Sequence, residues 1–479
     1  MLKRSAHGAR DLGLAQAVKF LVQFAGLVVL SRALGPTAVG IAAVAFAIVG
    51  FAEYFRDFGL SVAAIRETHL DADQRNALFW TNTALGSILG LLLLALAAPL
   101  AQVFGLIELR AVLCSLAVTF LLNGIGTQFR AGLTRAQFFR PLALADSISP
   151  LVGLVLAMLA AFSGWGYWSL VVQFLVAAFL SNAIVIASSD WLPGRPRRGA
   201  DMRHLYGFGV NYALSQLIGY VGNNLHTLAL GFFTSAGSAG IYSRAYQLSI
   251  GTLDQVKAPA TTVILPSLAS ARSQPNVLLQ QLLTGQMLIS YATLPLAALL
   301  STSGTDLATM LLGTEWRSVG EVISVLALAA ALQQLATVAA WQMITSGRAK
   351  ALRNYMSIST ILKGLGVLVG VPYGIIGVGI GYTAAVAIAW PVALIVAARA
   401  TSLPAMPLLQ QGFRFLTLGI SAAGFGWGAQ QILPDGGHAA RLGMALVGVT
   451  GAYGCALAFA PFRRDLRRVT MVLRLTLIK

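Results

Sequence analysis

The chain has 479 residues, of which 57% are hydrophobic and only 10% are charged, and its mean hydropathy is +0.76. This composition lies outside the range of soluble globular domains and leaves no room for a sizeable one. The formal net charge of +17 is spread thinly between apolar runs, so it does not form the clustered basic face of a nucleic-acid-binding protein.

Apolar runs long enough to cross the hydrocarbon layer, roughly 20 residues each, recur along the whole chain. They are too long and too continuous for barrel strands, and backbone groups must be paired inside lipid, so each run is expected to be a helix. A first group is predicted near residues 12–33, 36–60, 76–104, 109–133, 140–163 and 166–188. A second group is predicted near 203–233, 236–268, 278–303, 319–345, 351–371 and 374–399, followed by a pair near 407–431 and 439–461. The expected fold class is an all-α polytopic membrane protein of about fourteen transmembrane helices.

Lys and Arg concentrate in alternate loops, and this asymmetry predicts which side of the membrane each loop faces. The predicted cytoplasmic loops and tail contain Lys3, Arg4, Arg66, Arg75, Arg135, Arg140, Arg195, Arg197, Arg198, Arg203, Arg272, Arg348, Lys350, Arg353, Arg463, Arg464, Arg467, Arg468 and Lys479. The opposite loops offer only Arg110, Arg317 and Arg441. Both termini are therefore expected in the cytoplasm, and the first span is expected to be retained because the N-terminus lacks a small-residue cleavage site.

Two stretches that lie 200 positions apart share a turn pattern, since residues 34–41 are LGPTAVGI and residues 234–241 are TSAGSAGI. Two weaker pairs follow in the same order, 133–136 with 346–349 and 164–166 with 374–379. This repeat predicts two pseudo-symmetric six-helix lobes with the substrate between them. The expected domains are an N-terminal lobe at 1–190, a cytoplasmic linker at 191–204, a C-terminal lobe at 205–400, a terminal helix pair at 401–462 and a basic cytoplasmic tail at 463–479.

Polar residues inside the predicted spans form stripes on single helix faces. Gln16, Lys19 and Gln23 share one face of the first helix. A similar stripe on the helix related by the repeat contains Asn211, Ser215, Gly219, Asn223 and His226. A charge at mid-membrane costs about 2.5–3.5 kcal/mol by insertion scales, so a cation there needs water or a partner. The candidate residues of a substrate pathway are Lys19, Gln23, Arg32, Asn211, Asn223, His226, Arg244 and Lys363, with snorkelling, structural ion pairing or packing as the alternative for each.

Charged residues near the predicted inner helix ends suggest a cytoplasmic gate. The offset of 200 relates Asp57 to Lys257, and these opposite charges could pair across the two lobes. Glu53, Arg56 and Asp254 lie within one helical turn of them. The alternative is pairing within each helix at i and i+3, Glu53 with Arg56 and Asp254 with Lys257. An exposed pair is worth only about 0–1 kcal/mol, so such a gate would bias an equilibrium and not lock it.

The sequence offers little for catalysis, and neither a cofactor nor a metal site is expected. Cys114 and Cys455 lie far apart in apolar runs, so they support neither a disulfide framework nor a metal cluster. Asp71 and Asp73 form a DxD motif, the best cue for a membrane glycosyltransferase, yet no nucleotide-binding domain adjoins it. A polymerase of glycan repeats would need a large external loop, and the sequence has none. The sequence also lacks a GxxxxGK[ST] motif, so it shows no sign of an ATPase.

Four motifs stand out in order along the chain: residues 30–36 (LSRALGP) with Gly40, 58–61 (FGLS), 240–246 (GIYSRAY) and 265–266 (LP). Together they resemble the polysaccharide-flippase branch, Wzx-like and exopolysaccharide exporters, of the multidrug/oligosaccharidyl-lipid/polysaccharide (MOP) exporter superfamily. The resemblance covers about residues 10–400. The chain departs from the family pattern at His226, where relatives commonly carry an acidic residue, and near Leu253 and Asp254, where the usual residue is a proline.

The resemblance implies a two-lobed MOP flippase fold in the bacterial inner membrane that alternates between inward and outward states. It implies that an undecaprenyl-diphosphate-linked oligosaccharide moves from the cytoplasmic to the periplasmic leaflet for exopolysaccharide, capsule or O-antigen synthesis. A basic lumen suits a pyrophosphate, because several Lys and Arg can contact its oxygens. The terminal pair is expected either to form an apolar groove for the polyprenyl tail or to serve as a structural buttress.

Two other functions stay open at this point. The first is a small-molecule or multidrug antiporter of the same fold, although that function favours an acidic, aromatic lumen. The second, less favoured, is a membrane glycosyltransferase or a polysaccharide polymerase. The expected partners are the lipid-linked glycan and membrane lipids, with a polysaccharide polymerase and a chain-length regulator as further candidates.

Overall fold

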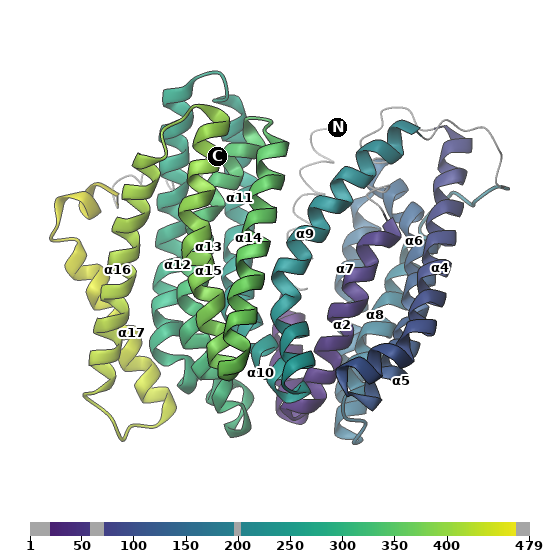
Figure 1. Ribbon diagram of the computed structural model, residues 1–479, viewed down its shortest axis with the longest axis horizontal. Helices are drawn as coiled ribbons and strands as arrows, with labels where there is room; N and C mark the ends of the chain where they lie inside the picture. The colour runs from purple at the N-terminus through teal and green to yellow at the C-terminus, as the bar shows by residue number, and fades with distance from the viewer. Residues whose placement is uncertain (1–19, 58–70, 196–202, 466–479) are drawn as a thin grey trace. The chain divides into compact units, whose positions relative to one another are not determined.

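The computed structural model describes residues 20–57, 71–195 and 203–465, and every regular element among them is helical. The chain divides into two compact units, Met1–Gly240 (unit 1) and Ile241–Lys479 (unit 2). Within each unit the helices lie side by side as a bundle (Figure 1). Unit 1 contains the helix Phe20–Ala33, α2 (Pro36–Asp57), α4 (Ala72–Phe104), α5 (Ile107–Leu116), α6 (Val118–Arg135), α7 (Phe139–Phe162), α8 (Trp168–Ala187) and α9 (Arg203–Phe233).

Helix α10 (Ala236–Tyr246) begins at the end of unit 1 and continues into unit 2 as the π-helical turn η1 (Gln247–Gly251) and α11 (Thr252–Ser270). Unit 2 then contains α12 (Pro275–Leu312), η2 (Thr314–Trp316), α13 (Arg317–Thr345), α14 (Ala349–Gly370), η3 (Val371–Tyr373), α15 (Gly374–Thr401), α16 (Met406–Gln430) and α17 (His438–Ala456).

Helices occupy all of the predicted spans, as far as the structure describes them. Among the described residues, 8 helical stretches are long and apolar enough to cross a membrane. The all-α polytopic fold class is therefore confirmed. The predicted span at 109–133 is broken at Ala117 between α5 and α6, and the span at 236–268 contains the turn η1. The unit boundary lies at Gly240, whereas the predicted lobes and linker remain a prediction.

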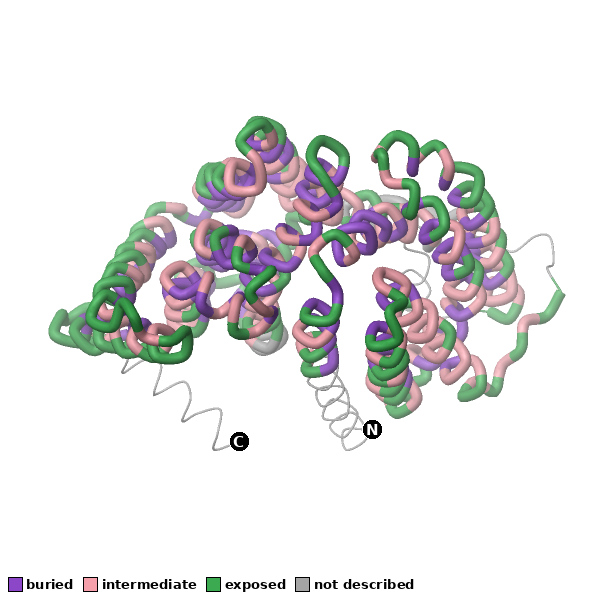
Figure 2. Tube along the Cα trace, turned by 90° about the horizontal axis from the view of Figure 1, so that it is seen from below, coloured by how far each residue is buried: buried purple, intermediate pink, exposed green. Residues whose placement is uncertain are grey.

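Helix α4 shows how these helices are suited to lipid. Its buried positions recur every three or four residues and lie on one face: Leu78, Phe79, Asn82, Gly86, Gly90, Leu93, Ala97 and Ala101. The other faces carry exposed leucines, with Leu91 exposed to 66%. Buried and exposed positions alternate along single helices in the same way elsewhere (Figure 2). An apolar exposed face is stable when the surrounding solvent is lipid, so this pattern agrees with a membrane protein.

Glycines let helices approach closely where the repeat was found. Gly40 near the start of α2 lies against Gly240 near the start of α10, and a Cβ built on Gly40 would lie 3.0 Å from the Gly240 amide nitrogen. The same Cβ would collide with the Ala236 carbonyl oxygen, and a Cβ on Gly240 would collide with that of Pro36. The two turns that the sequence repeat relates are thus packed backbone against backbone, which no side chain would permit.

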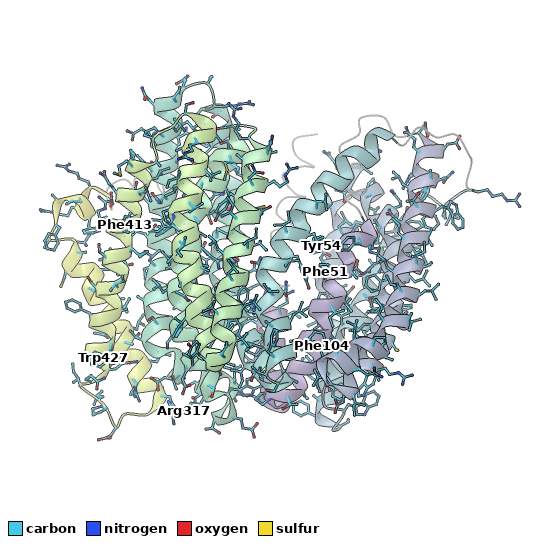
Figure 3. The ribbon with its side chains drawn as sticks, viewed as in Figure 1. Phe51, Tyr54, Phe104, Arg317, Phe413 and Trp427 are labelled. Atoms are coloured by element: carbon cyan, nitrogen blue, oxygen red, sulfur yellow. The ribbon has the colours of Figure 1, made fainter. Side chains whose placement is uncertain are left out.

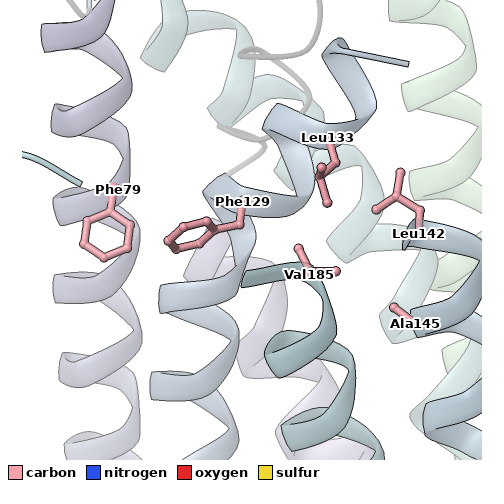
Figure 4. Close-up of a cluster of buried hydrophobic side chains, with 6 residues drawn as sticks. All are labelled: Phe79, Phe129, Leu133, Leu142, Ala145 and Val185. Atoms are coloured by element: carbon pink, nitrogen blue, oxygen red, sulfur yellow. The ribbon is translucent and has the colours of Figure 1, made fainter. Parts of the chain in front are cut away.

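A cluster of buried apolar side chains holds α4, α6, α7 and α8 together in unit 1 (Figure 4). Its members are Phe79, Phe129, Leu133, Leu142, Ala145 and Val185. The rings of Phe79 and Phe129 meet edge to face with centroids 6.0 Å apart, and Trp191 packs on both. These three rings hold α4 and α6 against the segment that follows α8.

We expect Phe129→Ala to lower the free energy of unfolding by about 3–5 kcal/mol, the range for emptying a large buried aromatic site. Thermal unfolding of the purified chain in detergent measures the effect. Phe162→Ala is the matched control, because Phe162 on α7 is exposed to 72%. Equal shifts for the two variants would contradict the assignment of this cluster as a core.

In unit 2, α13 is the central helix and packs on α12 and α15. In the apolar part of α13, 72% of the stretch is buried, whereas only 17% of the corresponding stretch of α8 in unit 1 is buried. Helices α14 and α15 approach closely through Gly366 and Gly381, since a Cβ on either would meet the carbonyl oxygen of the other. The terminal pair α16 and α17 packs on α12, with Ala298, Ala422, Val449 and Ala452 in its core.

Candidate functional site

The predicted stripe on the first helix is only partly described. Lys19 lies outside the described residues, whereas Gln23 and Arg32 are exposed on the helix Phe20–Ala33. On α9, Asn223 is exposed and His226 is buried, with 2% of its surface exposed. The side chain of Asn211 lies outside the description. Their shared role in a pathway therefore stays a prediction.

Tyrosines that the sequence did not single out join α9 to α2 within unit 1. The Tyr220 hydroxyl lies 3.2 Å from the Phe46 carbonyl oxygen and 3.1 Å from that of Ala47. The Tyr220 ring packs 5.1 Å from Tyr54, which Figure 3 labels beside Phe51. Gly50 leaves the space for this ring, because a Cβ there would lie 2.6 Å from the ring carbon Cζ.

A second aromatic contact joins the far end of α9 to α4. There Phe232 packs edge-on against Phe104, with centroids 5.8 Å apart.

Arg244 is the most deeply buried cation among the predicted pathway residues that the structure describes, with 8% of its surface exposed. It stands near the end of α10, and its Nη1 donates to Gln247 Oε1 over 2.9 Å. Among the described residues its Nε has no hydrogen-bond partner. A π-helical turn follows directly at Gln247–Gly251. Such turns are common at functional sites, so the geometry singles out this stretch.

Lys363 on α14 lies in the same unit and meets an aromatic ring. Its ammonium nitrogen is 5.4 Å from the centroid of Tyr382 on α15, within the range of a cation–π contact. The Tyr382 hydroxyl accepts a 2.9 Å hydrogen bond from Gln333 Nε2 on α13, and its ring lies 6.2 Å from that of Tyr246. Tyr246, Gln333 and Tyr382 thus join the segment that carries Arg244 to the helix that carries Lys363.

The gate candidates pair within their own helices. Lys257 Nζ donates to Asp254 Oδ1 over 2.6 Å, and Gln334 Nε2 on α13 adds a 3.2 Å hydrogen bond. Arg56 Nε donates to Glu53 Oε2 over 2.6 Å. This is the intrahelical arrangement that the sequence left as the alternative. The side chain of Asp57 lies outside the description, so its pairing with Lys257 stays a prediction.

A polar pocket lies within unit 1 between α2, α6 and α8, and we call it the unit 1 pocket. Its cavity volume is about 310 Å³. Its polar lining consists of Arg56, Asn123, Thr127, Arg130, Ser181 and Asn182. Only Arg56 was predicted. The available signal was the spacing of Asn123, Thr127 and Arg130 at i, i+4 and i+7, which places them on one face of α6.

An apolar groove lies within unit 2 between α12, α13 and the first helix of the terminal pair, α16. Its lining is mostly small and apolar, including Leu294, Ala297, Ala331, Gly419 and Ile420. The outer side of α16 is also apolar, since Phe413 and Trp427 are exposed to 55% and 61% and stand toward opposite ends of the helix (Figure 3).

Polar contacts attach the terminal pair to α12. Asp306 on α12 is buried and accepts a 2.8 Å hydrogen bond from His438 Nδ1 at the start of α17. Gln430 at the end of α16 donates to Ser303 over 2.9 Å, where α12 has non-helical backbone angles. In the first half of α16, Arg414 pairs with Asp465 over 2.5 Å, and the hydroxyl of Tyr291 on α12 lies 3.5 Å from the same carboxylate.

The DxD motif that was considered for catalysis has a structural role at Asp71. The Asp71 carboxylate accepts the Gln74 backbone N–H over 2.6 Å and caps the N-terminus of α4, as a capping box does. Cys114 and Cys455 are free thiols. Within the described ranges, no three His, Cys, Asp or Glu side chains gather to hold a metal ion.

Comparisons with known proteins agree with one another. A family model described as polysaccharide biosynthesis protein matches residues 29–321. The chain is 23% identical over 337 residues to the teichuronic acid biosynthesis protein TuaB of Bacillus subtilis, a match that covers 68% of each chain. It is 20% identical over 387 residues to the lipopolysaccharide biosynthesis protein WzxC of Escherichia coli, which covers 79% of this chain and 78% of WzxC.

Two solved structures share the fold. The lipid II flippase MurJ in an inward closed conformation matches with a TM-score of 0.74 at 12% identity, covering 93% of this chain and 98% of MurJ. A multidrug resistance MATE family transporter of the MOP superfamily, in an inward-facing conformation, matches with a TM-score of 0.65 at 13% identity. That match covers 80% of this chain and 94% of the transporter.

Proposed function

The chain belongs to the family of polysaccharide biosynthesis proteins, and on this basis we propose that it flips a lipid-linked oligosaccharide across the bacterial inner membrane. The glycan repeat is carried on undecaprenyl diphosphate and serves cell-surface polysaccharide synthesis. Both termini of the protein face the cytoplasm, and a polysaccharide polymerase and a chain-length regulator act on the product. The similarity to TuaB and WzxC, which are named as teichuronic acid and lipopolysaccharide biosynthesis proteins, supports this proposal. So does the shared fold with MurJ, which is named as a lipid II flippase.

The observation that carries the proposal is the buried guanidinium of Arg244. Its Nε is buried without a hydrogen-bond partner among the described residues. Burying a charge in a membrane costs free energy. An anionic ligand that compensates the charge gives a reason for an arginine at this position. A diphosphate supplies several oxygens that accept charge-assisted hydrogen bonds from Arg and Lys. Arg244 therefore holds the diphosphate of the lipid carrier, together with Lys363, whose ammonium group lies over the ring of Tyr382.

Depletion of the protein in its host tests the proposal. We expect lipid-linked oligosaccharide to accumulate in the cytoplasmic leaflet while surface polysaccharide falls, because synthesis continues without transport. A mass spectrometric count of the lipid-linked glycan measures this directly. If depletion instead leaves the glycan pool unchanged and raises sensitivity to lipophilic cations, the antiporter function suggested by the shared MATE fold replaces it.

We further propose that the apolar groove between α12, α13 and α16 holds the polyprenyl tail. A flexible apolar chain suits a lining of Ala, Gly, Leu and Ile, which lacks charged groups to desolvate. A photoreactive prenyl diphosphate should therefore label peptides that contain Gly419 or Ile420. Label confined to helices other than α16 would leave the terminal pair with the role of a structural buttress.

A further inference from the structure

The unit 1 pocket lies near one end of its unit. Arg56 is the residue before the last of α2, Arg130 stands near the end of α6, and Val185 near that of α8. The predicted orientation places these helix ends on the cytoplasmic side, the side from which the proposed function moves the lipid-linked oligosaccharide. A pocket at this end lies where the glycan would be taken up.

The pocket is held in place by a network of side-chain hydrogen bonds. Asn123 Nδ2 donates to Glu53 over 2.8 Å, and Asn182 Nδ2 donates to Asn123 Oδ1 over 3.0 Å. Arg56 Nη1 donates to Thr127 Oγ1 over 2.6 Å. Gly126 is required here because a Cβ there would lie 2.6 Å from the Asn182 amide carbon. The sequence thus keeps polar groups of three helices in fixed positions around an open space, which is preorganisation for a ligand.

The two cations of the pocket are paired with carboxylates that lie outside its lining. Arg56 pairs with Glu53, and Arg130 pairs with Asp146 of α7 while its Nη1 lies 3.4 Å from Ser181 Oγ. The lining therefore carries no net charge. Both amide hydrogens of Asn182 are used, by Asn123 Oδ1 and by the Ala178 carbonyl oxygen, so the pocket offers a ligand the Asn182 Oδ1 acceptor and the Ser181 hydroxyl. This differs from Arg244, which has no salt-bridge partner among the described residues.

Such a lining fits a neutral polyhydroxylated ligand better than a phosphate or a metal ion. Each sugar hydroxyl both donates and accepts, as Asn, Ser and Thr do, so the two surfaces can satisfy each other. Phe174 adds an aromatic wall that is stacked on Phe46 with centroids 5.0 Å apart. The cavity volume of about 310 Å³ lies at the lower end of the usual range of about 300–1,000 Å³ for small-ligand pockets.

We infer that the unit 1 pocket is a glycan subsite that binds a neutral sugar residue of the lipid-linked oligosaccharide. This inference rests on the proposed function, which supplies the lipid-linked oligosaccharide as the ligand. The subsite distinguishes substrates by their sugars, and Asn182 and Ser181 are its specificity-determining residues.

Binding to the full-length protein in lipid nanodiscs tests the inference with two probes. One probe is undecaprenyl diphosphate without sugar, and the other is the lipid-linked oligosaccharide extracted from cells depleted of the protein. We expect Ser181→Ala and Asn182→Leu to raise the Kd for the sugar-bearing probe about tenfold, the effect of losing one or two hydrogen bonds. The Kd for the sugar-free probe should not change.

Ser163→Ala is the matched control, because the Ser163 hydroxyl is exposed and donates only to Leu159 of its own helix among the described residues. Equal weakening of both probes by Ser181→Ala would show a structural network and overturn the inference. Unchanged binding of both probes by the two variants would overturn it as well. In either case the wild-type protein still binds both probes and the proposed function stands. Failure of the wild-type protein to bind either probe would instead remove the proposed function and the subsite together.

Discussion

Arg244→Gln should lower glycan export at least about tenfold while the protein remains folded, because each charge-assisted hydrogen bond to a phosphate oxygen is worth about 1.5–3 kcal/mol. The variant should unfold at the same temperature as the wild type or higher, since it removes a charge buried away from water. Arg244→Lys should keep part of the activity, because an ammonium retains the charge but not the planar fork of donors.

Surface polysaccharide and thermal unfolding in detergent are measured on the same set of variants. Arg317→Gln is the matched control, since Arg317 is exposed at the start of α13 (Figure 3) and its loss should change neither quantity. Normal export by Arg244→Gln would contradict the diphosphate site. A parallel loss of export and thermal stability would assign Arg244 to the fold and not to the substrate.

Gly40→Ala should destabilise the protein strongly, because the added methyl group would collide with the carbonyl oxygen of Ala236. Backbone atoms cannot rotate away as a side chain can, so α2 and α10 must separate at this turn. Overpacking costs typically about 1–3 kcal/mol, and a collision with backbone belongs at the upper end of that range. Gly240→Ala should behave alike, since its Cβ would meet the carbonyl oxygen of Pro36.

The control for this pair is Gly35→Ala in the same turn, because a Cβ built on Gly35 meets no described heavy atom within 4 Å apart from its chain neighbours. Unfolding temperature and protein level in membranes are the two measurements. If Gly40→Ala and Gly35→Ala are equally stable, the close packing of the two related turns does not hold.

Much of the fold could be predicted because each span must be apolar and must pair its own backbone hydrogen-bonding groups inside the lipid. Length and apolarity place the helices to within a few residues, as the predicted 374–399 and the observed Gly374–Thr401 illustrate. The repeat pointed to Gly40 and Gly240 because glycine is needed where backbones touch. The turn η1 was missed because one wider turn at Gln247–Gly251 hardly changes the hydrophobic pattern of a long apolar helix.

The site was harder to predict because it depends on partners from other helices. Arg244 was found from its charge alone, but neither Gln247 nor the tyrosine contact of Lys363 could be derived from one helix. Asn123 and Asn182 were passed over because a single amide in an apolar span resembles a packing residue. Their 3.0 Å hydrogen bond joins α6 to α8, and only the packing of those two helices brings the amides together.

Reconstituted transport tests the central claim most directly. Purified protein is placed in liposomes that contain lipid-linked oligosaccharide with a fluorophore on its glycan, and an impermeant reductant is added outside. We predict that the label of the inner leaflet becomes accessible in proteoliposomes, and does so at least about tenfold more slowly in liposomes with the same amount of Arg244→Gln protein. Label that stays protected with the wild-type protein, as it does in protein-free liposomes, would contradict the claim that this chain flips the lipid-linked glycan.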